Sequence, residues 1–237
     1  MVLIINWLST DEINVVHQYR PQKNTAWKHY KTIIKSNGPL MYVYKSDNKY
    51  FLWKGVFAYN ALSSLFPQKK VPCYVIPYTI STLEWQEQFL LMCSIEKAHH
   101  VIRQETVAAI LQNTDNNTKK IAMILNKSEE EVNFEYITHP DIPINHKKII
   151  IDKNRIKLVN SFYTDPLLIP YQSLLLESVI QENKRLTYEK LDYFRFFLQL
   201  GFNLKTIDFG IVEQLAEFSR IVDKKEAWRI YWRQLYE

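Results

Sequence analysis

The chain has 237 residues, of which 47% are hydrophobic and 14% aromatic, enough to bury one large core or several small ones. It contains only four glycines, which argues against a hairpin-rich or barrel fold and against phosphate-binding glycine loops. We therefore expect a mostly helical protein. The net charge of +5 permits an anionic partner such as nucleic acid without requiring one.

The two cysteines and the N-terminal residues indicate in which cellular compartment the protein works. Cys73 and Cys93 are the only cysteines and lack a CxxC spacing, which predicts buried thiols in a reducing compartment and no zinc or disulfide framework. The apolar run Met1–Leu8 is too short to span a bilayer, and it has neither a basic flank nor a small-residue cleavage site. We expect a cytoplasmic protein with no metal, cofactor or membrane partner.

The first third of the chain mixes helix and strand signals. The Ser9–Glu12 segment fits a capping box and predicts a helix to about Tyr19, and a turn is expected at Asn37–Pro39. Aromatic and β-branched runs around the turn Ser46–Asn48 predict a hairpin. The other expected elements are a helix at Asn24–Lys35 with Trp27, Tyr30 and Ile34 on one face, strands at Leu40–Tyr44, Lys49–Trp53 and Val71–Ile76, and a helix from Val56 to Phe66. This pattern predicts a small α/β domain at residues 1–80.

Helical signals dominate after Pro77. The prolines in Thr138–Pro143 mark a boundary, which predicts a helical domain at 81–138 and a helical C-terminal domain at 139–237. The predicted fold class is α+β, mostly helical. Besides a central helix pair, the expected helices run from Ser81 to Lys97, Arg103 to Leu111, Tyr171 to Glu182, Thr187 to Leu200 (capped by Gly201) and Ile207 to Tyr236.

The stretch Asn116–Ile137 predicts two short helices joined by a tight turn. Asn117 or Thr118 can cap the first helix, and Ser128 with Glu131 fits a capping box for the second. Helical spacing predicts the apolar face that each helix turns inward. The first helix contributes Ile121, Ala122, Ile124 and Leu125, and the second contributes Val132 and Tyr136. The pattern is typical of a helix-turn-helix and also of an ordinary helical hairpin.

If the pair is a helix-turn-helix, the start of its second helix enters the major groove. The residues predicted to face base edges are Lys127, Ser128, Glu129, Glu130 and Asn133, whereas Thr118, Lys119 and Lys120 face phosphate. The four glutamates of the second helix oppose this interpretation because phosphates repel carboxylates, although carboxylates also suit a helix N-terminus. Lys147 and Lys148 open a basic run that either grips the DNA backbone or forms a solvated helix face.

Other chemistry-bearing residues favour structural roles. We expect His99 and His100 to point apart on a helix and to bind no metal. Glu84, Glu87 and Glu96 lack a convergent base or nucleophile, so we do not expect an enzyme. The aromatic and basic run Trp228–Arg233 could stack on bases, but its helical spacing favours packing or self-association.

The order of these elements resembles a ParB-type partition protein. The matching residues are Lys49–Leu62 (KYFLWKGVFAYNAL) with Gly55 and Ala61, Lys70–Ile76 (KVPCYVI) with Pro72, the long helix Glu84–Lys97, and the helix pair Thr118–Ile137. The resemblance covers about two fifths of the chain, roughly Leu40 to Ile137. It implies an α/β domain followed by a DNA-binding helix-turn-helix and dimerisation.

The sequence departs from that family at its nucleotide site. The family's phosphate-binding arginine in G-x-x-R-x-x-A falls on Ala58, with Val56 and Phe57 before it, and the Asn-Pro-x-Glu segment has no Asn-Pro near Val101–Glu105. No reactive cysteine follows Gly55, as it does in a related oxidoreductase. We therefore expect neither CTP hydrolysis nor that oxidoreductase activity.

Three hypotheses follow. The first is a ParB-like protein of partition or transcription regulation that reads duplex DNA without nucleotide hydrolysis and forms a homodimer through its C-terminal helices. The second is a protein-interaction adaptor that keeps the fold and docks a basic partner. The third is a nucleotide-dependent enzyme in the N-terminal domain.

Overall fold

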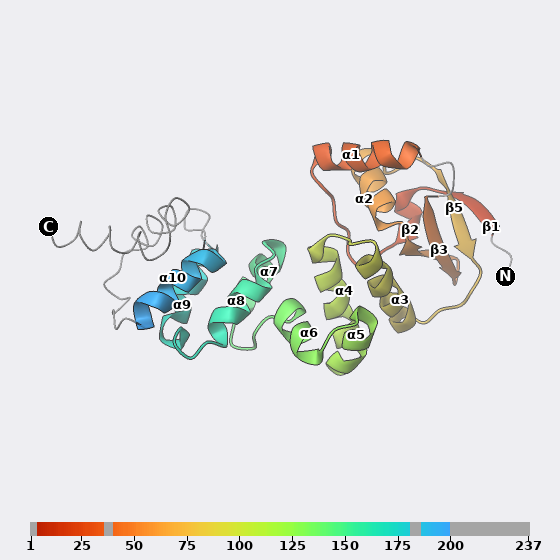
Figure 1. The fold of residues 1–237 in the computed structure, drawn as a ribbon. Coiled ribbons are helices and arrows are strands. Elements are labelled where there is room, and N and C mark those ends of the chain that lie inside the picture. Colours follow the sequence, from red (N-terminus) through yellow and green to blue (C-terminus); the bar gives the residue numbers. More distant parts are fainter. Residues whose placement is uncertain (1–3, 36–39, 181–185, 200–237) are drawn as a thin grey trace. The chain divides into compact units, whose positions relative to one another are not determined.

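The computed structural model describes residues 4–35, 40–180 and 186–199. The chain divides into two compact units between Ile137 and Thr138. A five-stranded sheet and helices form the first unit, and the described part of the second unit is helical (Figure 1). The α+β, mostly helical class predicted from the sequence is therefore confirmed for the described residues.

The sheet has the strand order β1-β5-β3-β4-β2. Its strands are β1 (Ile4–Leu8), β2 (Ile13–Asn14), β3 (Met41–Ser46), β4 (Lys49–Lys54) and β5 (Val71–Ile76). β3 pairs antiparallel with β4 and parallel with β5. Asp47 and Asn48 between β3 and β4 have φ values of 49° and 60°, the left-handed conformation that a tight hairpin turn needs. The predicted hairpin is confirmed.

The helix predicted from Ser9 to Tyr19 is wrong. The Ser9–Glu12 capping pair is present, but it opens only a 3-10 helix, η1 (Thr10–Glu12), before β2 begins. Ile13 is 5% exposed and pairs with Tyr50 of β4. Its β-branched side chain, followed by Val15 and Val16, fits an extended strand better than a helix, and core burial decides between the two. The apolar run before Ser9 supplies β1, which the sequence analysis did not identify as a strand.

Four helices follow the expected order in the first unit. They are α1 (Lys23–Ile34), α2 (Val56–Leu65), α3 (Thr82–Ile95) and α4 (His100–Gln112). Of the three residues predicted to share one face of α1, Trp27 and Tyr30 contact each other and Phe66, whereas Ile34 is 62% exposed. Ala26 is fully buried, and its small side chain lets α1 pack closely against α2.

One hydrophobic core joins the sheet to α3. The Trp85 Nε1–H of α3 donates to the carbonyl oxygen of Leu52 in β4 at 2.7 Å, and Phe89 packs into the same core as Met41 and Val43. This core therefore contains residues from both sides of the domain boundary that the sequence predicts between residues 80 and 81. Leu90, on another side of α3, belongs to a separate cluster with α4 and the two helices that follow, α5 (Thr118–Leu125) and α6 (Glu129–Tyr136).

The second unit has its own core. Its described helices are α7 (Ile144–Asp152), α8 (Ile156–Tyr163), α9 (Gln172–Ile180) and α10 (Tyr188–Gln199), with a 3-10 helix η2 (Ile169–Tyr171). Phe162, Leu175 and Phe194 are fully buried there. No helix in the described ranges is long and apolar enough to cross a bilayer. Three predicted features lie outside the described ranges. They are the turn at Asn37–Pro39, the helix cap Gly201, and the helix Ile207–Tyr236, which contains the Trp228–Arg233 run.

Candidate nucleic-acid interface

The predicted helix pair is present as α5, a tight turn and α6. Asn126 ends α5 in the left-handed conformation with φ 52°, and the Lys127 N–H donates to the carbonyl oxygen of Ala122 at 3.0 Å. Ser128 then starts α6 through a capping box: its backbone N–H donates to the Glu131 carboxylate at 2.8 Å, and the Glu131 N–H donates to the Ser128 hydroxyl at 3.1 Å. Local residues thus fix the angle between the helices.

A small apolar core fixes the pair to the rest of the first unit. Ile121, Ala122 and Leu125 of α5 and Val132 of α6 are buried against α3 and α4. On those two helices the contacting residues are Leu90, Val107 and Ile110. The opposite side of α6 stays in solvent, since the residues from Ser128 to Glu131 are exposed. The pair is therefore anchored by its inner side, while the first turn of α6 remains accessible to solvent.

The residues predicted to contact phosphate differ in their surroundings. Lys120 forms an ion pair with Glu87 of α3 at 2.5 Å. The Thr118 hydroxyl donates to the Glu129 carboxylate at 2.9 Å, which ties the N-terminal ends of α5 and α6 together. Lys119 is exposed and has no ion-pair partner among the described residues. Of these three residues, Lys119 is the one that presents an uncompensated charge.

The residues predicted to face bases are also partly engaged. Lys127 forms an ion pair with Glu135 at 3.0 Å. Partial burial lowers its pKa, but the hydrogen bond and charge of Glu135 outweigh this and raise the pKa of Lys127 above its ordinary value. Ser128 is used as a cap. Glu129 and Asn133 are exposed on α6, together with Phe134.

Lys147 and Lys148 lie on α7, which belongs to the second compact unit and not to the unit that holds the helix pair. Lys148 is exposed and Lys147 is half-buried. Lys153, a later member of the same basic run, donates to the carbonyl oxygen of Ile180 at 2.6 Å. That lysine therefore holds α7 to the end of α9.

The start of α2, where the resembling family binds phosphate, carries an internal anion. The backbone N–H groups of Gly55 and Val56 each donate to the carboxylate of Glu96 at 2.9 Å. These groups are the unpaired donors of a helix N-terminus, the kind that phosphate uses elsewhere. Glu96, considered above only as a possible catalytic carboxylate, occupies them from the end of α3.

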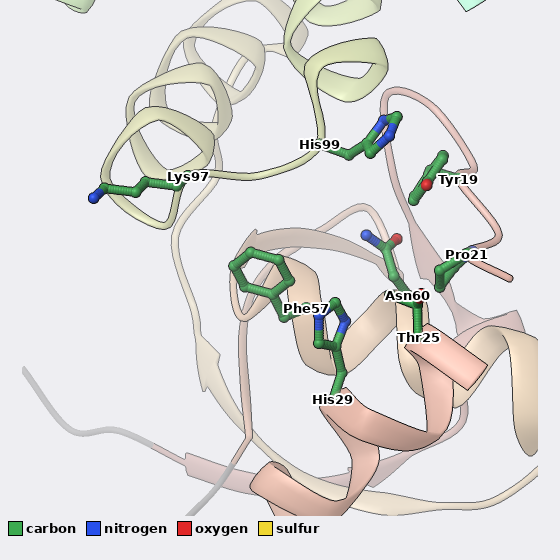
Figure 2. A pocket seen from close by; sticks show the side chains of 8 residues that line it. All are labelled: Tyr19, Pro21, Thr25, His29, Phe57, Asn60, Lys97 and His99. Carbon is green, nitrogen blue, oxygen red and sulfur yellow. The ribbon is translucent and has the colours of Figure 1, made fainter. Parts of the chain in front are cut away.

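A small cavity lies beside this point, between α1, α2 and the α3–α4 turn (Figure 2). Its volume is about 150 Å³, below the range of roughly 300–1,000 Å³ that small-molecule sites usually have. Tyr19, Phe57 and His99 contribute rings to its wall, and Asn60 lies between them. Figure 2 shows the Lys97 ammonium directed away from the other lining side chains, so the cavity gains no cation from it.

The histidine pair at this cavity differs from the prediction. The rings of His99 and His100 are 4.1 Å apart rather than pointing away from each other, because His99 is the N-cap of α4 and has non-helical backbone angles. His99 also stacks on Tyr19 at 4.0 Å. Burial, with a smaller contribution from Arg103, lowers the pKa of His99. Among the described residues, no group of three or more His, Cys, Asp or Glu side chains is placed to hold a metal.

Sequence reasoning missed a strong charge asymmetry. The first 80 residues hold ten basic and three acidic residues, so residues 81–237 keep 20 of the 30 basic and 22 of the 25 acidic ones. Counting charge separately for each predicted domain would have found it. The basic residues are Arg20, Lys23, Lys28, Lys31, Lys35, Lys45, Lys49, Lys54, Lys69 and Lys70; the acidic ones are Asp11, Glu12 and Asp47.

No protein-family model matches the chain, and no curated protein matches it in sequence. Among solved structures, it is similar to the C-terminally truncated chromosome-partitioning protein ParB from Caulobacter crescentus complexed to the centromeric parS site. The identity is 11%, the TM-score is 0.44, and the match covers 74% of this chain and 94% of that one. The same protein complexed with CTP-gamma-S matches at 12% identity and a TM-score of 0.27, over 73% and 98% of the chains.

Proposed function

We propose that this chain binds duplex DNA through α5 and α6, with the first turn of α6 in the major groove. The observation that carries the proposal is the contrast between the two helices. The inner side of α5 is buried against α3 and α4, whereas residues Ser128 to Glu131 at the start of α6 remain exposed. A second helix held in this way by a fixed first helix can enter a groove without rearranging the core.

Side-chain chemistry supplies specific contacts for such a complex. The Asn133 amide has the donor and acceptor that pair with adenine, and a carboxylate accepts from the amino group of cytosine. Glu129 keeps acceptor capacity because one of its oxygens receives the Thr118 hydroxyl. Lys119, at the N-terminal end of α5, is placed to neutralise a phosphate, and the exposed Lys148 is a further candidate in the second unit.

Few phosphate contacts should make this binding weak and only mildly salt-dependent. Lys120 and Lys127 are already paired with Glu87 and Glu135. Each neutralised phosphate adds about 0.9 to the slope of log affinity against log salt concentration. We therefore expect a shallow slope for the helix pair, and most of its specificity must come from base contacts.

The test is a charge reversal of Lys119, measured by binding to mixed-sequence duplex DNA across a salt titration. Lys119→Glu should weaken binding by about tenfold and reduce the salt slope by about one unit. Lys120→Glu is a poorer variant because it would place a carboxylate beside Glu87 and disturb packing. Lys31→Glu makes the same charge change on an exposed position of α1 and should leave the affinity nearly unchanged. A wild-type chain that does not bind duplex DNA at low salt would contradict the proposal.

The absence of nucleotide hydrolysis is part of the same proposal. Glu96 already satisfies the two N–H groups at the start of α2, and a phosphate would have to displace that carboxylate. Ala58 supplies no guanidinium. Calorimetry with CTP and with ATP should detect no binding; clear micromolar binding of either nucleotide would show that this interpretation of Ala58 and Glu96 is wrong.

A second candidate function is an adaptor that docks a basic partner. The specific observation in its favour is that α6 exposes Glu129, Glu130 and Glu131 while the neighbouring Lys127 is neutralised by Glu135. Exposed Phe134 offers an apolar anchor beside those carboxylates. The salt titration separates the two functions, because an adaptor does not bind DNA at low salt but does bind a Lys- and Arg-rich peptide.

The biological setting and the oligomeric state extend the proposal. The order of elements that resembles ParB-type partition proteins supports DNA partition or transcription regulation as the process. We also propose a homodimer, since a helix-turn-helix usually gains affinity from two-fold symmetry. The proposed contact is made by the C-terminal helices, of which the one predicted at Ile207–Tyr236 lies outside the described residues. Light scattering that gives a monomer at micromolar concentration would count against the dimer.

A further inference from the structure

One face of the sheet carries a row of aromatic side chains. Side chains alternate across a strand, and the pairing register places Ile5 beside Tyr74 and Tyr74 beside Tyr42. Their neighbours along the strands, such as Cys73 and Val43, turn to the other face and are fully buried in the core. We define the aromatic face by six side chains on β1, β3, β4 and β5: Ile5, Trp7, Tyr42, Tyr44, Trp53 and Tyr74.

The rings of this face form a connected platform. Tyr42 lies 4.9 Å from Tyr74 and 6.0 Å from Trp53, and Trp53 lies 5.6 Å from Tyr44, measured between ring centroids. Trp7 is 63% exposed and Ile5 is 52% exposed, and both lie on the edge strand β1 (Figure 1). Tyr42, Tyr74 and Trp53 are half-buried, and Tyr44 is buried in the core at the end of the platform. Contiguous exposed apolar surface of this kind usually marks a binding site.

Lysine side chains lie beside the rings of the platform. The Lys54 Nζ lies 5.5 Å from the centre of the Tyr42 ring. It reaches that position because the register between β3 and β4 shifts at Tyr42, which brings both Trp53 and Lys54 to the same side. Lys49 of β4, which pairs with Ser46 on the same side of the sheet as Tyr42 and Tyr44, is exposed as well.

Almost no negative charge compensates these lysines. Between Ile13 and Ile80 the sequence has ten basic residues and one acidic residue, Asp47. Within the described part of the chain, none of those ten residues takes part in a salt bridge. Uncompensated like charges destabilise the folded unit, so the pattern points to a polyanionic partner rather than to internal stabilisation.

We propose that the aromatic face binds single-stranded nucleic acid. Bases stack on Trp7, Tyr74 and Tyr42, and Lys54 and Lys49 neutralise the phosphates. Stacking suits single strands because their bases are free to leave one another and lie on a ring, which a duplex does not allow. This surface is separate from α5 and α6, so the proposal does not depend on the duplex-binding function.

Two other occupants fit the observations less well. A second copy of the same face would bring its own lysines against these, with almost no carboxylate to pair them. A bilayer surface would take up apolar side chains that insert into it, but only Ile5 and Trp7 at the edge of this face are exposed, whereas its centre is half-buried. Both occupants remain measurable outcomes of the test.

The test uses fluorescence anisotropy with a labelled single strand of about a dozen nucleotides and a duplex of the same length. Tyr74→Leu and Tyr42→Leu keep an apolar side chain and remove the ring, and Trp7→Ala removes an exposed ring. Each should weaken single-strand binding by about tenfold and leave duplex binding unchanged. Lys54→Gln should reduce the salt slope for the single strand by about 0.7. Circular dichroism and thermal melting establish that each variant is folded.

Two controls make the outcome decisive. Tyr188→Leu makes the same chemical change at an exposed position of the second unit and should keep full single-strand affinity. Lys119→Glu should impair only the duplex. The proposal is overturned if the folded wild-type chain does not bind the single strand at low salt, or if Tyr188→Leu loses as much as Tyr74→Leu. It is also overturned if Trp7→Ala abolishes self-association or binding to anionic lipid vesicles while single-strand affinity is unchanged.

Discussion

Glu96 caps α2 from the end of another helix, by accepting a hydrogen bond from the Gly55 N–H at 2.9 Å. Its second oxygen accepts from the Val56 N–H at the same distance. Gly55 is the N-cap of α2 and has no side chain with which to cap the helix itself. A carboxylate also opposes the positive end of the helix dipole. The contact therefore joins α3 to α2 and occupies the place where an external anion would bind.

The first prediction concerns Glu96→Gln. A glutamine has one oxygen and one NH₂ group, so one of the two N–H donors of α2 would face another donor. We expect a loss of about 1–3 kcal/mol in the free energy of unfolding, measured by urea denaturation, because hydrogen bonds to charged groups are the stronger ones. Glu130→Gln changes an exposed glutamate on α6 and serves as the matched control. Equal stability of the two variants would show that the Glu96 contact contributes nothing.

The second prediction concerns Gly55 itself. Its φ of 94° is strained for any residue with a Cβ, and an added Cβ would lie 2.3 Å from the Leu40 carbonyl oxygen and 3.0 Å from the Met41 Cα. Both are backbone atoms, which cannot move aside cheaply. Gly55→Ala should therefore cost about 2–4 kcal/mol of unfolding free energy.

Ser63→Ala, at a half-buried position of the same helix, is the control for Gly55→Ala and should change stability by less than about 1 kcal/mol. A Gly55→Ala chain that melts with wild-type stability would mean that the β4–α2 connection can rearrange. The requirement for glycine at this position would then be refuted.

Cysteine reactivity gives the third prediction. Cys73 and Cys93 are free and buried, which confirms buried thiols. Burial raises the pKa of Cys73 to about 12. Burial, followed by the nearby Glu96 charge, raises the pKa of Cys93 further still. Since the thiolate is the reactive form, neither thiol should react with a disulfide reagent at neutral pH until the chain unfolds. Rapid labelling of the native chain would contradict this; Ser173→Cys, at an exposed position of α9, provides an accessible reference thiol.

The sequence predicted local features well because their causes are local. Ser128 and Glu131 are three residues apart, and the capping box they form needs nothing else. The hairpin at Asp47 and Asn48 is likewise set by two residues that tolerate left-handed backbone. In the candidate site, these rules located α5 and α6 and the turn between them.

Contacts between distant segments could not be predicted in this way. Gly55 and Glu96 are 41 residues apart, and nothing in either neighbourhood specifies the other. The same holds for Lys120, whose pairing with Glu87 removes a charge that the sequence seemed to offer to DNA. Ile13 shows the converse case, in which burial against β4 overrides a valid helix-start signal at Ser9.

The last prediction uses three capping boxes that share one chemistry. The backbone N–H of Ser9, Ser81 and Ser128 donates to the carboxylate of the glutamate three residues later, at 2.8, 3.1 and 2.8 Å. These hydrogen bonds, from the serine backbone first and the serine side chain second, lower the pKa of Glu12, Glu84 and Glu131 below 4.5. The charged carboxylates therefore stabilise the starts of η1, α3 and α6.

The direction of the pH dependence follows from the sign of these shifts. A carboxylate with a lowered pKa in the folded state contributes its full stability above the unfolded-state value near 4.5, and loses it as the pH falls through the folded-state value. Replacing all three glutamates by glutamine keeps a hydrogen-bonding side chain but removes the charge. Melting temperature should then fall less steeply with pH below 4.5 than it does in the wild-type chain. Glu130→Gln should retain the wild-type profile, and parallel profiles for the triple variant and the wild type would refute the assignment.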